Sequence, residues 1–293
     1  MRHLFNVMLS PKSTKGSISI NSGQFFLWEK RNESWYGTYG SRIIKLKIID
    51  GSPEFTSFPE FKTFEKKIFR LDDDIKAIFA ELTRDPLVHT LIKKYPGLRL
   101  MRQEPEQCLF SFLCASNTNI PMIRRMLYNL TRRLGAPMSV DGMEFFTFPT
   151  AAEISKATTE QLRSCSLGYR AKAIKEVAQD IAEGTLNLES LRRIEYREAK
   201  SQLLKVRGIG NKIADCVLLF SLEKLDAFPI DVWISRALSQ HYSWLLDRPL
   251  GDALTPRQYD SLSERMRLHF GRYAGYAQQY LYYDIRQRAG KKW

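Results

Sequence analysis

The chain has 293 residues, of which 44% are hydrophobic, so one large domain or two packed domains can bury a core without disulfide or metal support. Its 45 lysines and arginines outnumber 32 acidic residues, and the formal net charge of +13 favours a polyanionic partner, either nucleic acid or an anionic membrane surface. No run approaches the roughly 18 apolar residues of a membrane span, and the first residues lack a signal-peptide pattern, so we expect a soluble intracellular protein.

The predicted elements fall into two groups along the chain. Segments 17–20, 25–30, 34–40 and 43–50 are β-branched and aromatic, which predicts strands over residues 1 to about 60. From residue 71 onward the apolar period approaches 3.6, which predicts helices to the end of the chain. Asp72–Asp74 suit the start of the first of these helices, because acidic side chains favour a first turn.

The fold class that follows is α+β, mostly α. We predict an antiparallel β-sheet domain with flanking helices over residues 1–97 and a helical domain over residues 98–293. The junction is placed at Pro96-Gly97, within Lys93–Leu100, because this dipeptide breaks a helix.

The four cysteines, Cys108, Cys114, Cys165 and Cys216, are scattered and form no CxxC pair. Zinc sites and disulfide frameworks show closer or more regular spacing, and an iron–sulfur cluster needs four clustered thiolates. We therefore predict no metal site, and we interpret the cysteines as small buried hydrophobes, with a functional role left open for Cys216 alone.

A glycine-rich turn between two predicted helices, at about residues 195–220, is the first candidate functional feature. Gly208 and Gly210 permit positive φ angles and a close approach of the backbone to a ligand. The helix that follows offers unpaired N–H groups and a partial positive charge, which suit a phosphate. The unit predicts a helix–hairpin–helix that binds a nucleic-acid backbone through Val206, Gly208 and Gly210. A tight turn between core helices is the alternative.

Lys212 lies at the start of the second helix, on the same face as Cys216 one turn later. Ile213, Val217 and Phe220 form the adjoining apolar stripe. Burial and the positive end of a helix both disfavour an ammonium group, so we expect a lowered pKa and an amine that can form a Schiff base. The alternative is a lysine that binds phosphate or extends its amine into solvent.

Asp231 follows Pro229 and precedes a helix predicted over residues 232–242, which its side chain can cap. The loop before it is long enough to bring the carboxylate beside Lys212. A lysine nucleophile and a carboxylate that stabilises a cationic sugar are the groups needed to cleave an N-glycosidic bond. Helix capping alone is the alternative explanation of Asp231.

Longer blocks of the sequence resemble the eukaryotic-type 8-oxoguanine DNA glycosylases of the helix–hairpin–helix–GPD superfamily. Besides VRGIGNKIADCVLLF and FPIDVW, matching blocks lie at 22–28, 108–120, 167–174 and 273–287, in the order of the family. The resemblance implies a bifunctional glycosylase/AP lyase that flips out and excises 8-oxoguanine from duplex DNA, then cleaves the strand 3′ to the abasic site by β-elimination. We expect a monomer that needs no metal or redox cofactor.

The resemblance assigns the chemistry to three positions of this sequence. Lys212 matches the Schiff-base nucleophile, and Asp231 matches the catalytic aspartate. Gly23 matches the residue whose backbone carbonyl accepts a hydrogen bond from the protonated N7, a hydrogen that guanine lacks. Because an unpaired buried carbonyl is costly, this contact would discriminate between the two bases.

The rest of the base pocket also follows from the resemblance. Gln278 corresponds to the amide that reads the Watson–Crick edge, and Cys216 to a thiol on one face of the base. An aromatic residue lies on the other face in the family, and here it corresponds to Tyr282, with Tyr283 as the alternative because the chain is one residue shorter than the family at this point. Phe220 completes the expected pocket.

Three further positions match residues that contact DNA in the family. Asn117 corresponds to the residue that fills the hole left by the flipped base, Tyr169 to the wedge beside it, and Arg170 to an arginine at the opposite base. Three of the residues matched to the family have a structural alternative when taken singly: Gly23 as a turn, Asn117 as a helix cap and Tyr169 as a core residue.

Three positions depart from the family pattern. Met122 stands where the family has a second arginine at the opposite cytosine, Thr118 replaces an asparagine, and Trp233 replaces a histidine after the catalytic aspartate. Loss of a bidentate base contact costs about 1–3 kcal/mol of discrimination, so we predict weaker opposite-base selectivity.

Two other functions fit parts of the sequence. A monofunctional glycosylase for alkylated purines uses water as its nucleophile and predicts no lysine at position 212. A DNA-binding hairpin module without catalysis explains the charge and the glycines, but not the pairing of Lys212 with Asp231.

Overall fold

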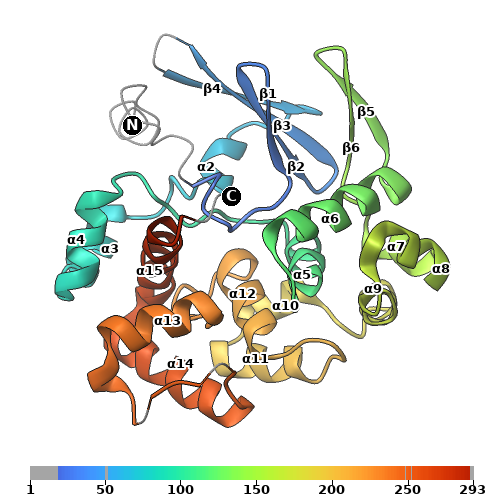
Figure 1. Ribbon diagram of the computed structural model, residues 1–293. Coiled ribbons are helices and arrows are strands. Elements are labelled where there is room, and N and C mark those ends of the chain that lie inside the picture. The colour runs from blue at the N-terminus through green and yellow to red at the C-terminus, as the bar shows by residue number, and fades with distance from the viewer. Residues whose placement is uncertain (1–18, 50–51, 248, 252, 291–293) are drawn as a thin grey trace.

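The structure is a computed structural model that describes residues 19–49, 52–247, 249–251 and 253–290. It is mostly helical, with an antiparallel sheet at one end of the molecule (Figure 1). This arrangement confirms the predicted class, α+β and mostly α. The predicted domain boundary after residue 97 stays a prediction.

The main sheet is a four-stranded antiparallel meander in the order β1-β2-β3-β4. Its strands are β1 (Trp28–Arg31), β2 (Ser34–Tyr39), β3 (Arg42–Ile49) and β4 (Ser52–Phe58). The register pairs Trp28 with Gly37 and Ile43 with Phe58. Aromatic and β-branched side chains of the sheet form a core of their own with residues of the next helix, α2 (Phe64–Ile68).

The predicted strands need two corrections. The strand expected at 25–30 begins only at Trp28, because the chain bends before it. The strand expected at 17–20 is wrong where the structure describes it, since Ser19 and Ile20 lie in a turn. Residues 17, 18 and 50 lie outside the described residues.

The prediction of helices to the end of the chain missed a second, two-stranded sheet. Strands β5 (Pro137–Val140) and β6 (Met143–Phe146) pair as a hairpin. Asp141 and Gly142 at its turn have φ angles of 52° and 73°, the left-handed geometry that an Asp-Gly hairpin turn requires. The hairpin packs on the main sheet, where Phe145 stacks on Tyr36 at 4.9 Å.

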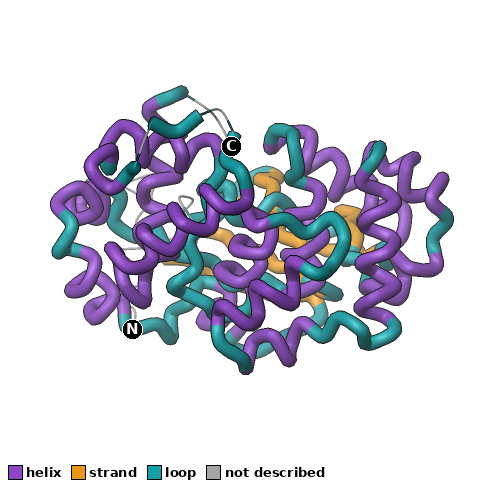
Figure 2. Tube along the Cα trace, turned by 90° about the horizontal axis from the view of Figure 1, so that it is seen from below, coloured by secondary structure: helices purple, strands orange, loops and turns teal. Residues whose placement is uncertain are grey.

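The helices surround α12, which runs through the middle of the molecule (Figure 1). Seen from below, they lie in front of the strands (Figure 2). Their bounds are α3 (Ile75–Leu82), α4 (Pro86–Lys94), α5 (Pro105–Cys114), α6 (Ile120–Leu134), α7 (Ala151–Lys156), α8 (Thr159–Leu162), α9 (Arg170–Ala182), α10 (Leu188–Arg193), α11 (Tyr196–Leu204), α12 (Asn211–Ser221), α13 (Val232–His241), α14 (Pro256–Phe270) and α15 (Ala274–Arg288).

Helix starts follow the local sequence closely. Asp74 caps α3 by accepting from the N–H groups of Lys76 and Ala77, as the acidic run predicted. Thr150 and Thr255 begin α7 and α14 with capping boxes. These short-range signals explain why the helical part could be predicted from the sequence.

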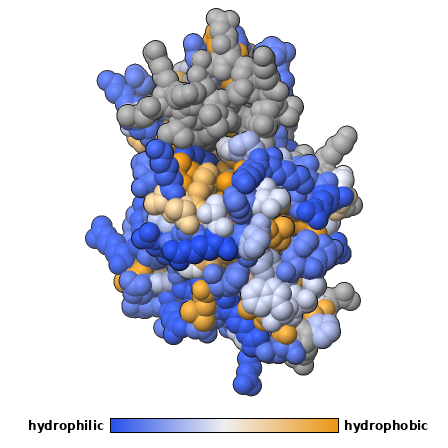
Figure 3. Space-filling model, turned by 90° about the vertical axis from the view of Figure 1, so that its left-hand side faces the viewer, coloured by the Kyte–Doolittle hydropathy of each residue, from blue (hydrophilic) through white to orange (hydrophobic). Residues whose placement is uncertain are grey.

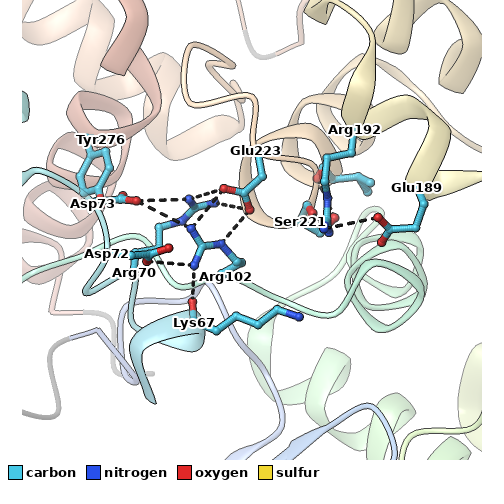
Figure 4. Close-up of polar contacts among 11 residues, drawn as sticks. Lys67, Arg70, Asp72, Asp73, Arg102, Glu189, Arg192, Ser221, Glu223 and Tyr276 are labelled. Carbon is cyan, nitrogen blue, oxygen red and sulfur yellow. Dashed lines mark hydrogen bonds and ion pairs between the residues drawn. The ribbon is translucent and has the colours of Figure 1, made fainter. Parts of the chain in front are cut away.

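A partly buried ion network joins the end of α12 to the segments after α2 and before α5 (Figure 4). Glu223 lies 2.7 Å from Nη1 of Arg70 and 2.8 Å from Nε of Arg102, and Arg70 is fully buried. Burial opposes ionisation of Glu223, but the two arginines outweigh it and hold the pKa of its carboxyl below the ordinary value. The network fixes the C-terminal end of α12 against the sheet side of the molecule.

The surface shown in Figure 3 is mainly hydrophilic, with hydrophobic residues in separate patches. Within the described ranges, no helix has both the length and the apolar character of a membrane span.

Candidate active site

A cleft of about 950 Å³ opens beside the N-terminal end of α12. Its walls come from the α5–α6 turn, the hairpin before α12, the segment before α13, and α15. Most of the predicted site residues line it, namely Gly23, Asn117, Gly208, Gly210, Lys212, Cys216, Phe220, Asp231, Gln278 and Tyr282. The fold therefore brings together residues that are far apart in the sequence.

The helix–hairpin–helix is formed by α11, the turn 205–210 and α12, as predicted. Gly208 has a φ of 89°, and a Cβ there would lie 2.9 Å from Cβ of Ala173, so the turn requires glycine. Gly210 has an ordinary φ of −94°, which corrects the expectation that both glycines provide positive φ. It begins α12 without a side-chain cap, leaving helix N–H groups available to an anion. Val206 is half-buried and does not line the cleft.

Lys212 is half-buried at the first turn of α12 and lines the cleft. Its Nζ lies 5.0 Å from the centroid of the Phe112 ring, a cation–π distance. Phe112 in turn stacks on Phe220, with centroids 5.6 Å apart. The amine is thus held between an aromatic floor and the open cleft.

Asp231 caps α13, as predicted, and lines the same cleft as Lys212. Its Oδ1 accepts from the N–H groups of Trp233 and Ile234, both at 2.9 Å. Among the described residues, no group donates a hydrogen bond to Oδ2, so this oxygen can interact with a ligand in the cleft. Burial raises the pKa of the Asp231 carboxyl, and the charge of Lys212 is the strongest of the effects that oppose this rise. Capping and catalysis are therefore compatible roles of one side chain.

A buried polar network supports the segment that carries Asp231. The Tyr259 hydroxyl accepts from the N–H of Ile230 at 3.0 Å and donates to Asp215 at 2.8 Å. Asp215 is fully buried and also bonds Tyr196 and Lys200. Since this network spans α11, α12 and α14, it fixes the loop before α13 relative to Lys212.

Gln278 presents one defined end of its amide to the cleft. Its Nε2 donates to the carbonyl of Pro229 at 3.0 Å, while its buried Oε1 has no partner among the described residues. The free end is thus an acceptor, which suits N–H donors on a base edge.

The walls beside Gln278 are neutral. Burial raises the pKa of the Cys216 thiol to about 12, so the group stays protonated at neutral pH. Tyr282 lines the cleft, whereas Tyr283 packs edge-on against Tyr95 with centroids 4.9 Å apart. Of the two tyrosines left open by the sequence, Tyr282 is therefore the one at the cleft.

Three residues predicted to contact DNA lie at or near the α5–α6 turn: Asn117 lines the cleft, whereas Tyr169 and Arg170 are not among its lining residues. Asn117 is exposed with a φ of 47°, and Asn119, not Asn117, caps α6, so the helix-cap alternative is wrong. Tyr169 is 69% exposed, which rules out the core alternative. The Arg170 guanidinium lies 4.5 Å from the Tyr169 ring centroid and donates to the Ser116 carbonyl, so Tyr169, the predicted wedge, is joined through Arg170 to the α5–α6 turn.

Sequence reasoning missed residues that the fold adds to the cleft. Arg286 lies over the rings of Trp233 and Tyr282, at 5.3 and 5.8 Å from their centroids. Its signal was present, because Gln278, Tyr282 and Arg286 recur at i, i+4 and i+8 on one face of α15. Met122, exposed in the first turn of α6, lies outside the cleft lining.

Comparison with known proteins agrees with this geometry. Residues 8–109 match the family model of the 8-oxoguanine DNA glycosylase N-terminal domain, and residues 110–249 match that of the HhH-GPD superfamily base excision DNA repair proteins. The chain is 32% identical over 279 residues to the N-glycosylase/DNA lyase OGG1 of Arabidopsis thaliana, an alignment that covers 90% of this chain and 75% of that protein.

Two solved structures share the fold over nearly the whole chain. One is MBOgg1 in complex with a low-affinity DNA ligand, with a TM-score of 0.83 at 30% identity, covering 93% of this chain and 92% of that one. The other is the Clostridium acetobutylicum 8-oxoguanine glycosylase/lyase in complex with double-stranded DNA containing cytosine opposite to 8-oxoguanine. It has a TM-score of 0.81 at 30% identity and covers 92% and 90% of the two chains. The chain therefore belongs to the 8-oxoguanine DNA glycosylase family, within the HhH-GPD superfamily of base excision DNA repair proteins.

Proposed function

We propose that this chain is a bifunctional DNA glycosylase/AP lyase that excises 8-oxoguanine from duplex DNA and then cleaves the strand 3′ to the abasic site. The observation that carries the proposal is the pairing of half-buried Lys212 with the capping carboxylate of Asp231 in one cleft, at the end of a helix–hairpin–helix. Relatives named N-glycosylase/DNA lyase support the combination of two activities.

Excision begins with the neutral amine of Lys212. As Nζ bonds C1′ of the flipped nucleotide, the bond from C1′ to N9 breaks and its electron pair leaves with the base, which takes up a proton. Positive charge develops on the sugar during this step, and the carboxylate of Asp231 offsets it.

Strand cleavage follows from the same covalent bond. The sugar ring opens to give an imine between Nζ and C1′, a Schiff base. The imine draws electrons from C2′, which loses a proton as the bond from C3′ to its phosphate oxygen breaks. Hydrolysis of the imine then returns free Lys212.

The flipped base is read from its edges and its faces. The carbonyl of Gly23 accepts the N7 hydrogen, and Oε1 of Gln278 accepts N–H donors of the Watson–Crick edge. Cys216 and Tyr282 cover the two faces, and Phe220 also lines the pocket. A neutral thiol and a protonated phenol suit this task, because burial raises the pKa of both groups.

The duplex is held by the hairpin before α12 and by three residues outside it, Asn117, Tyr169 and Arg170. Uncapped N–H groups at Gly210 and the start of α12 receive a backbone phosphate. Asn117 fills the vacated position, Tyr169 wedges beside it, and Arg170 faces the unpaired base. One chain supplies every wall of the cleft, which supports action as a monomer, and we place this activity inside the cell, where the DNA is.

Borohydride trapping tests the proposal. Wild-type protein is expected to crosslink to a duplex that carries 8-oxoguanine, and Lys212→Gln is expected not to. Excision without any crosslink would favour a monofunctional glycosylase that uses water. Binding without excision would favour a DNA-binding module. A crosslink that persists in Lys212→Gln would overturn the assignment of the lysine.

A further inference from the structure

The segment Ser22–Gln24 is held by buried hydrogen bonds on both sides of Gly23. Gly23 has a φ of 77°, a left-handed conformation that other residues rarely adopt. Ser22 and Gln24 are both fully buried. Among the described residues, no hydrogen bond uses the Gly23 carbonyl as an acceptor, so this oxygen is available on the wall of the cleft.

On one side of Gly23, the contact comes from α15. Nε2 of Gln279 donates to the carbonyl of Ser22 at 3.1 Å, across 257 residues of sequence. Gln279 is 2% exposed and lines the same cleft as its neighbour Gln278. One short stretch of helix therefore carries both the amide that faces the base edge and the amide that holds the Gly23 segment.

On the other side of Gly23, the contacts come from residues 99–103. The carbonyl of Gln24 accepts from Nε2 of Gln103 at 2.5 Å, and Oε1 of Gln24 accepts from the N–H of Met101 at 2.8 Å. The N–H of Gln103 donates to the carbonyl of Phe220, near the end of α12. The Gly23 segment is thus tied to the helix that carries Lys212.

We infer that Gln279 is a specificity-determining positioning residue, which holds the Ser22–Gly23 peptide so that the Gly23 carbonyl meets the N7 hydrogen of 8-oxoguanine. The inference rests on the proposed function, because it concerns how that pocket distinguishes two bases. Gln279 does not touch the base in this account. It acts through Ser22, whose carbonyl it fixes.

The physical reason is that discrimination depends on where the carbonyl lies, and not only on its presence. Guanine offers a lone pair at N7, which repels a fixed carbonyl, whereas 8-oxoguanine offers a donor. A carbonyl free to turn away escapes the repulsion and loses part of the hydrogen bond. Removing the donor at Gln279 should therefore weaken binding of 8-oxoguanine relative to guanine.

The test uses Gln279→Met, which keeps the length of the side chain and removes its donor. In a non-cleaving Lys212→Gln background, Kd is measured for duplexes that differ only by 8-oxoguanine or guanine. We expect the preference for 8-oxoguanine to fall about threefold to tenfold, the value of one hydrogen bond. Gln287→Met, an exposed position two turns later on α15, is the matched control and should keep the full preference.

A second variant gives a readout that a purely structural role would not move. In Gln279→Glu the ionised carboxylate cannot donate to Ser22, whereas the protonated acid can. The preference for 8-oxoguanine, taken relative to the parent at each pH, should therefore rise as the pH falls. A preference that stays flat with pH contradicts the inference.

Abasic DNA distinguishes a positioning role of Gln279 from a general loss of folding or activity in the variant. With Lys212 intact, Gln279→Met should crosslink to a preformed abasic site as well as wild type does, because that substrate has no base to read. An unchanged base preference, or an equal loss of abasic-site crosslinking, would overturn the inference. If the Lys212→Gln parent binds both duplexes equally, the proposed function itself fails, and that result is distinct from failure of Gln279 alone.

Discussion

The two ends of α12 use charge in opposite ways. At the N-terminal end, Lys212 and Asp231 face an open cleft, and burial raises the pKa of the aspartate, so its ionised form lowers the stability of the fold. At the C-terminal end, Glu223 is paired with two buried arginines and its pKa is lowered, so its ionised form adds stability. The difference separates the charges that we propose for the reaction from those that stabilise the fold, a trade-off expected of active sites.

The largest effect on activity is expected at the N-terminal end of α12. Lys212→Gln should lower 8-oxoguanine excision by more than about a thousandfold, because the nucleophile is lost. It should leave the melting temperature close to that of wild type. Excision kinetics and borohydride trapping on the same duplex check the prediction, and a melting temperature that falls with the activity would contradict the separation of the two ends.

Asp231→Asn should lower excision about a hundredfold to a thousandfold, the usual effect of losing one preorganised electrostatic group. Asparagine also caps helices well, so α13 should keep its start. Because the raised pKa makes the ionised aspartate unfavourable in the fold at neutral pH, the variant should be at least as stable as wild type. Thermal melts at pH 7 and single-turnover kinetics test both parts, and a clear loss of stability would show that capping dominates.

At the other end, Glu223→Gln should lower the free energy of unfolding by about 3 kcal/mol at pH 7, since Arg70 and Arg102 each lose their nearest carboxylate and Arg70 is fully buried. The pKa of Glu223 is lowered from its ordinary 4.5, so its contribution is complete above that pH and is lost only as the pH falls further. Urea unfolding of both proteins across this range measures the difference.

A matched control uses an exposed ion pair of the same type. Glu264 pairs with Arg197, and the two side chains are 50% and 78% exposed. Glu264→Gln should change the free energy of unfolding by less than about 1 kcal/mol. If Glu223→Gln and Glu264→Gln lower the free energy of unfolding equally, burial does not explain the stabilising role of the ion network at the C-terminal end of α12.

The smallest effect concerns the opposite base. With Met122 exposed on α6, wild type should excise 8-oxoguanine opposite cytosine and opposite adenine at similar rates. Met122→Arg should raise the preference for cytosine by about fivefold to a hundredfold, the range for one bidentate base contact. Excision rates across the four opposite bases test this, and a wild-type preference of hundreds-fold for cytosine would refute the idea of weak selectivity.

The accuracy of prediction from the sequence differs from element to element. The helix starts, the helix–hairpin–helix and the cap at Asp231 were predicted because each depends on residues within a few positions of one another. The β5–β6 hairpin was missed although Asp141-Gly142 is a strong turn signal, because its short strands sit in a region of helical periodicity. The start of β1 was placed too early because Phe25–Leu27 are aromatic and apolar for the sake of core packing, not of strand pairing.

The sequence by itself predicted the family and the proposed chemistry, from a basic chain, a lysine at the start of an apolar helix and a carboxylate nineteen residues later, in blocks that match one enzyme family. Only the tertiary structure decided that Tyr282 rather than Tyr283 lines the cleft, which end of the Gln278 amide is free, and that Gln279 reaches Ser22. The physical reason is the sequence separation of the interacting residues. Periodicity and capping act within a turn or two, whereas these contacts join residues on elements that meet only when the core has packed.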